Sequence, residues 1–127
     1  MAELVSYWRK RMEAFGHAFR GMADLISHHP HAKLHLLATL MILFLGILLS
    51  FERWEWVAVL ICMGLVWTAE ALNTALEYLT DLVSPEYHPL AGKAKDMAAA
   101  AVLCAALASL VVGLLLAGPK LWQLMTS

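Results

Sequence analysis

Residues 70–96 read EALNTALEYLTDLVSPEYHPLAGKAKD, and the rest of the chain is organised around this stretch. At about 3.6 residues per turn, four of its polar side chains fall on one narrow face of a helix: Glu70, Asn73, Glu77 and Asp81. An apolar run precedes them, so this polar face belongs to a helix suited to a membrane. Polar side chains cost free energy inside a bilayer, and their presence there indicates a functional site. The helix is expected to end at Ser84–Pro85, because proline lacks a backbone donor and disfavours a helical residue before it.

The composition indicates an integral membrane protein. Of the 127 residues, 61% are hydrophobic, and the mean hydropathy is +0.69, which is too apolar for an ordinary soluble domain of this length. The net charge of −1 argues against nucleic acid as a partner, because nucleic-acid binding calls for a basic face. Cys62 and Cys104 both lie in apolar runs, where buried free thiols are expected.

Residues 1–30 have the pattern of an amphipathic helix that lies on a membrane surface. Five large apolar side chains follow helical spacing: Trp8, Met12, Phe15, Phe19 and Met22. Basic residues are interleaved with them and would meet lipid phosphates, while the apolar face lies in the headgroup region. The alternative is that this helix is only an anchor. Charges near the N-terminus also interrupt any signal-peptide core, so the mature protein is expected to be the whole chain.

Three longer apolar segments are expected to cross the membrane, at residues 33–51, 55–83 and 94–118. The first is close to the roughly 20 helical residues that a hydrocarbon core requires, and the other two are longer. A loop over 86–93 is expected to join the last two, and Pro119 is expected to lie beyond the end of the third. Four alanines of the third segment form a ridge that permits close helix packing: Ala98, Ala101, Ala105 and Ala108.

The basic residues predict the orientation of these segments. Seven of the nine lysines and arginines lie in residues 1–33 and 82–96, while Arg53 and Lys120 lie on the other side. The side richer in basic residues is cytoplasmic, so the N-terminus and the end of the polar face are expected in the cytoplasm. Glu70 is then shallowly inside the leaflet, and Glu77 and Asp81 reach water. A lipid headgroup and a soluble, charged reactant could meet between these depths.

Histidines at positions 28, 29, 31 and 35 raise the question of a zinc site. Their spacing matches no closed site, and no Cys or carboxylate partner stands beside them in the sequence. A polar linker with one or two functional residues is the better interpretation.

Two carboxylates, an amide and the Lys95–Asp96 pair are suited to phosphoryl transfer. One carboxylate would take the proton of an acceptor hydroxyl, another would hold Mg²⁺ on nucleotide phosphates, and a lysine would neutralise charge on those phosphates. The chain has no Walker A motif and no kinase-type glycine-rich loop. From the residues alone, two alternatives remain: a polar face that joins helices in an oligomer, and a cation pathway along the stripe, for which three spans supply few pore walls.

The sequence closely resembles the prokaryotic diacylglycerol kinase and undecaprenol kinase family, small membrane lipid kinases unrelated to soluble kinases. The resemblance extends over nearly the whole chain and includes Gly16 and Arg20–Gly21. Its signature segments are Glu70-Ala-Leu-Asn-Thr-Ala-Leu-Glu77, Asp81, Glu86-Tyr-His88 and Ala94-Lys-Asp96. It implies an all-α homotrimer in the bacterial inner (cytoplasmic) membrane, each chain giving a surface helix and three transmembrane helices. Active sites would be shared between neighbouring subunits at the cytoplasmic interface.

The resemblance also implies roles for particular residues. Glu70 would be the general base that deprotonates the lipid hydroxyl, and Glu77 would bind the Mg²⁺ that accompanies ATP. Asn73 would orient groups near the transferred phosphate. Five further residues would surround the nucleotide: Glu86, Tyr87, His88, Lys95 and Asp96.

Two positions depart from the family pattern. His29 stands where members carry a glutamate as second metal ligand, and imidazole is a poor ligand for Mg²⁺. Two catalytic alternatives follow: Glu77 and the phosphates hold Mg²⁺ without His29, or a different divalent ion takes its place. The third alternative is a non-catalytic trimer that binds lipid or metal. His17 stands where diacylglycerol kinases have a tyrosine near the nucleotide, and Lys10 would supply a basic contact. For the lipid, residues 84–89 resemble undecaprenol kinases and residues 91–97 diacylglycerol kinases, with a preference for undecaprenol.

Overall fold

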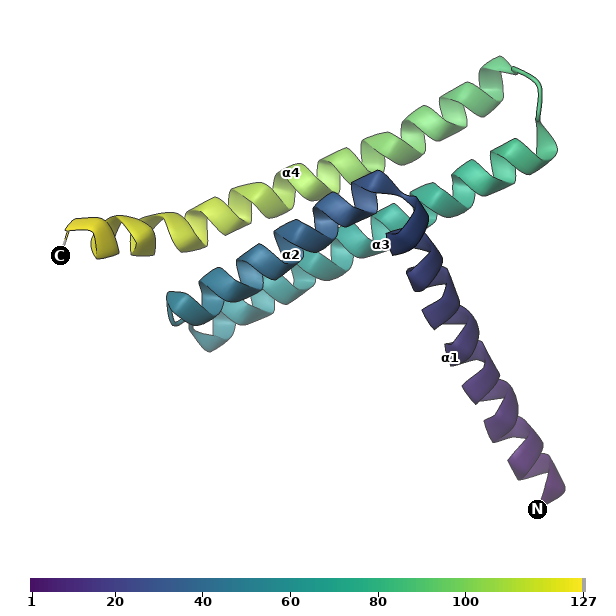
Figure 1. The fold of residues 1–127 in the computed structure, drawn as a ribbon, viewed down its shortest axis with the longest axis horizontal. Helices are drawn as coiled ribbons and strands as arrows, with labels where there is room; N and C mark the ends of the chain where they lie inside the picture. Colours follow the sequence, from purple (N-terminus) through teal and green to yellow (C-terminus); the bar gives the residue numbers. More distant parts are fainter. Residues whose placement is uncertain (127) are drawn as a thin grey trace.

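The computed structural model describes residues 1–126, with only the backbone of Ala2, and every regular element in this range is an α-helix. The four helices are α1 (Ala2–His28), α2 (Pro30–Leu48), α3 (Arg53–Val83) and α4 (Pro89–Thr126) (Figure 1). The helices α2, α3 and α4 are long and apolar enough to cross a membrane. The predicted class, an all-α membrane protein with three spanning helices after an N-terminal helix, is confirmed.

Helix α1 leaves the bundle formed by the other three helices (Figure 1). Its apolar stripe is exposed, as Trp8, Phe15 and Phe19 show, which is the arrangement expected of a helix that lies in a membrane surface. A single extended residue, His29, separates α1 from α2. Pro30 explains this short joint, because it disfavours a helical His29 and fits the first turn of α2. The second helix therefore begins at Pro30 instead of residue 33.

The turn between α2 and α3 is held by a tightly packed cluster. Ser50 has a positive φ of 49°, and Glu52 and Glu55 form a reciprocal capping box at the start of α3. The Glu55 side chain is only 5% exposed and meets Lys120 of α4 at 2.6 Å. Close by, Gly46 lies against the aromatic rings of Phe51 and Trp56.

Helices α3 and α4 pack along most of their length and make most of the contacts between helices (Figure 1). Two of the four ridge alanines, Ala98 and Ala105, are buried, whereas the other two are exposed. Helix α3 ends at Val83, as the Ser84–Pro85 pair indicates. Helix α4 begins at Pro89, within the expected loop, and passes through Pro119 to Thr126. Proline at position 119 removes one helical hydrogen bond without ending the helix.

Both cysteines have free thiols. The expectation that both are buried is wrong for Cys104, which is exposed, while Cys62 is half-buried. Apolar neighbours in the sequence therefore do not place Cys104 in the packed core of the chain.

Candidate active site

The polar stripe of α3 passes from a buried to an exposed environment along the helix. Glu70 is 3% exposed, Asn73 and Glu77 are half-buried, and Asp81 is exposed near the end of α3. The four residues share one face of α3, and their exposure increases toward the end of the helix at Val83. The stripe thus connects an apolar environment with a polar one.

Asn73 and Glu77 form a hydrogen-bonded pair one helical turn apart. The Asn73 side-chain amide donates to Glu77 Oε1 at 3.2 Å. Asn73 Oδ1 is buried and has no hydrogen-bond partner among the described residues. A buried polar atom without a partner is costly, and such an atom in a native site is explained by a ligand, an ion or water.

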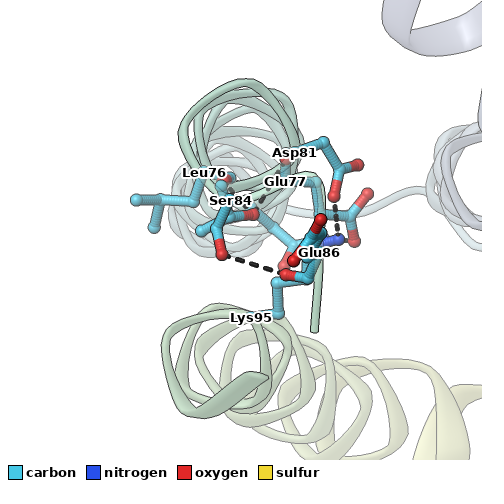
Figure 2. Close-up of polar contacts among 8 residues, drawn as sticks. Leu76, Glu77, Asp81, Ser84, Glu86 and Lys95 are labelled. Atoms are coloured by element: carbon cyan, nitrogen blue, oxygen red, sulfur yellow. Dashed lines mark hydrogen bonds and ion pairs between the residues drawn. The ribbon is translucent and has the colours of Figure 1, made fainter. Parts of the chain in front are cut away.

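Lys95 links the end of the stripe to α4. Its Nζ contacts Asp81 Oδ1 at 2.5 Å, and Figure 2 shows this contact between α3 and α4. The Ser84 hydroxyl donates to the Glu86 carbonyl oxygen at 3.1 Å, which shapes the connection between the helices. Asp81 was on the predicted stripe, but its pairing with Lys95 was not foreseen, although both residues flank the Ser84–Pro85 break.

The remaining residues predicted around a nucleotide also lie at this connection. Tyr87 is 91% exposed, and the His88 ring accepts a hydrogen bond at Nδ1 from the Leu90 backbone N–H at 3.2 Å. Asp96 is exposed on the first turns of α4. These side chains therefore lie at the same end of α3 and α4 as Lys95.

Lys10 and His17 are not brought to the polar stripe of their own chain. Both are exposed residues of α1, the helix that diverges from the bundle (Figure 1). The Arg20 guanidinium lies 2.8 Å from His17 Nδ1, within the same helix. In a single chain, these two residues are separate from Glu70 and Glu77.

His29 belongs to a second polar group, at the corner between α1 and α2. Its Nε2 lies 3.0 Å from the Tyr78 hydroxyl of α3, which donates to Asp24 Oδ2 at 2.7 Å. His28 Nδ1 lies 3.0 Å from the other carboxylate oxygen of Asp24. The hydroxyl of Tyr78 holds the pKa of the Asp24 carboxyl below its usual value, because it donates to the charged form. No sequence pattern indicated Asp24 and Tyr78 as partners, because 54 residues separate them.

The oxygen donors of the stripe fit a hard divalent ion. Mg²⁺ is held through one or two carboxylates together with substrate phosphates. Glu77 offers such a carboxylate, and the unpartnered Asn73 oxygen lies one turn away. Across residues 1–126, no group of three or more His, Cys, Asp or Glu side chains is placed to hold a metal ion. An ion at Glu77 would accordingly need further ligands from phosphates and water.

The chain is similar in sequence to a family of known proteins. Residues 16–117 match the model of the prokaryotic diacylglycerol kinase family. The undecaprenol kinase of Bacillus subtilis is 37% identical over 109 residues, which cover 86% of this chain and 89% of that protein. A diacylglycerol kinase of Synechocystis is 36% identical over 113 residues, 88% of this chain and 65% of that protein. The diacylglycerol kinase of Escherichia coli is 28% identical over 87% of this chain and 91% of that protein.

The family match covers most of the chain, including the whole polar stripe and the connection to α4. The resemblance seen in the sequence is thereby confirmed. The chain belongs to the prokaryotic diacylglycerol kinase family and is a membrane lipid kinase.

Proposed function

We propose that the protein transfers the γ-phosphoryl group of ATP to the hydroxyl of a membrane lipid alcohol. The observation that carries this proposal is the gradient along α3, from buried Glu70 to exposed Asp81 and its partner Lys95. An acceptor hydroxyl at the membrane surface would meet Glu70, while a nucleotide in water would meet Lys95. The two reactants then approach along the stripe from opposite environments.

Glu70 acts as the general base. No donor among residues 1–126 bonds its carboxylate, so its lone pairs are free to accept a proton. As the lipid oxygen bonds to the γ-phosphorus, its proton passes to Glu70 and the bond from that phosphorus to the ADP oxygen breaks. ADP and a lipid phosphate are the products. Burial of the base excludes water as a competing acceptor.

Other residues bind and orient the nucleotide. The Glu77 carboxylate and Asn73 oxygen would hold Mg²⁺, which when bound neutralises charge on the phosphates. Lys95 adds positive charge, and its pairing with Asp81 fixes the direction in which its ammonium group points. Glu86, Tyr87, His88 and Asp96 surround the same end of α3 and α4. The cofactor is Mg²⁺ or another divalent ion, with ATP as co-substrate.

Undecaprenol is the preferred acceptor, with undecaprenyl phosphate as product, and diacylglycerol, giving phosphatidic acid, is the alternative. The 84–89 segment and the similarity to the Bacillus subtilis protein named undecaprenol kinase support the first. The relatives named diacylglycerol kinase support the second.

The protein is proposed to act as a homotrimer in the bacterial inner membrane. Its N-terminus would be cytoplasmic, because seven of the nine lysines and arginines lie on that side. This orientation places Lys95 and Glu77 where ATP is available.

The test is ATP consumption by the purified protein in mixed micelles. Undecaprenol and diacylglycerol are offered separately, each with Mg²⁺, Mn²⁺ or Zn²⁺. Turnover is expected with one of the lipids and is expected to vanish in Glu70→Gln, which removes the base but keeps its shape. The matched control is Glu13→Gln, an exposed carboxylate whose partner, Arg9, lies in the same helix, and it should retain turnover. Full activity of Glu70→Gln would contradict the mechanism.

A further inference from the structure

We propose that Tyr78 is a positioning residue for phosphoryl transfer, because its hydroxyl fixes the corner between α1 and α2 against α3. This role for the reaction rests on the proposed function, whereas the docking of the corner does not. Tyr78 directly follows Glu77 in the chain, so its hydrogen bonds tie the corner to the part of α3 that carries the stripe. Its partners, Asp24 and His29, lie on either side of the α1 end.

The hydrogen bonds of Tyr78 have one consistent assignment. The hydroxyl has a single hydrogen, and at 2.7 Å from Asp24 Oδ2 it donates to this carboxylate. The Tyr78 oxygen can then only accept from His29 Nε2, 3.0 Å away. His29 therefore carries a proton on Nε2, and the same contact fixes the orientation of its ring, whose centroid is 5.6 Å from that of Tyr78. The Tyr78 hydroxyl thus forms hydrogen bonds both to the Asp24 carboxylate of α1 and to His29, which joins α1 to α2.

The joint needs such a contact because it is short. His29 is the one non-helical residue between α1 and α2, so its two backbone torsions set the angle between these helices. Apart from buried Leu25 near its end, α1 is largely exposed along its length. A helix of 27 residues is about 40 Å long. A rotation of roughly 10° at the joint would displace Lys10, about 28 Å along the helix, by about 5 Å.

Loss of the Tyr78 hydroxyl should lower the fraction of molecules in which α1 is docked. Tyr78 does not touch the reacting atoms, so the chemical step in a docked molecule is unchanged. Apparent affinity falls in proportion to the competent fraction, and saturating nucleotide restores that fraction. Tyr78→Phe is therefore expected to raise KM for ATP by about three- to tenfold, while kcat stays within about twofold.

The docking is tested independently of activity by distances between spin labels. Labels are attached to Glu13→Cys on α1 and Leu82→Cys on α3, both exposed positions, in a protein whose native cysteines are replaced by serine. Labelled chains are diluted with unlabelled chains so that distances within one chain dominate. The parent protein should give one narrow distance distribution, and Tyr78→Phe should broaden it.

The matched control is Tyr7→Phe. The Tyr7 hydroxyl accepts a hydrogen bond from Arg11 within α1 alone, so its loss should change neither the distances nor KM. Asp24→Asn should act on the same contact, and combining it with Tyr78→Phe should cause little further broadening, because both changes remove one interaction.

The possible results separate the claims. An unchanged distance distribution in Tyr78→Phe would overturn the docking contact, whether or not the protein turns over ATP. A broadened distribution with an unchanged KM would overturn the positioning role. Absence of turnover in the parent protein would contradict the proposed function and leave the distance measurement as the test of the contact.

Discussion

At Glu77, one substitution removes the charge of the side chain and keeps its shape. Glu77→Gln keeps an oxygen that accepts from Asn73 Nδ2 but removes the negative charge that attracts a divalent ion. The Mg²⁺ concentration for half-maximal turnover is expected to rise by about tenfold or more, since metal sites lose this much when a supporting group is altered. A titration of turnover against Mg²⁺ measures it. Glu3→Gln, on the exposed start of α1, is the control, and a superimposable titration for both variants would rule out Glu77 as a ligand.

At the scale of residues, sequence reasoning was limited by separation along the chain. The stripe from Glu70 to Asp81 could be predicted because helical periodicity is a local property. The Tyr78–Asp24 contact could not, since it depends on the angle between α1 and α3. His29 combines a predictable and an unpredictable feature. Pro30 indicated its place between two helices, but no pattern indicated its hydrogen bond to Tyr78.

At the scale of elements, the α2–α3 turn gives a test of packing. A Cβ added at Gly46 would lie 2.7 Å from the Trp56 ring and 3.0 Å from Phe51. Overpacking of this kind costs about 1–3 kcal/mol, which exceeds the gain of roughly 1 kcal/mol from replacing glycine by alanine in a helix. Gly46→Ala is thus expected to lower the thermal midpoint in detergent, followed by circular dichroism.

Gly64→Ala is the matched control for this packing, because its added Cβ meets no atom of the chain within 4 Å. Its midpoint should equal or exceed that of the parent. Equal midpoints for the two variants would mean that the turn repacks around the methyl group.

The bounds of the helices could be predicted only approximately, because proline has opposite effects at different positions. Pro30 and Pro89 begin helices, whereas Pro119 is accommodated inside one.

For the whole molecule, the distance of Lys10 from its own α3 stripe leads to a prediction about subunits. If one chain of the proposed trimer supplies α1 and its neighbour supplies α3, mixing Lys10→Ala chains with Glu70→Gln chains should restore activity. About a quarter of the sites would combine two intact halves when chains assort at random. Turnover of co-reconstituted variants, compared with each variant alone, measures this. Mixtures as inactive as the single variants would mean that each site is built within one chain.

The pairing of Glu55 with Lys120 has a consequence for how the molecule is made. Glu55 is synthesised 65 residues before Lys120, and its side chain is nearly enclosed in the finished bundle. Until α4 has entered the membrane, this carboxylate has no cation to compensate its burial, and an uncompensated buried charge is strongly unfavourable. The α2–α3 hairpin is therefore expected to reach its final packing only after the last helix is inserted, and a chain that ends before residue 120 should have a less stable hairpin.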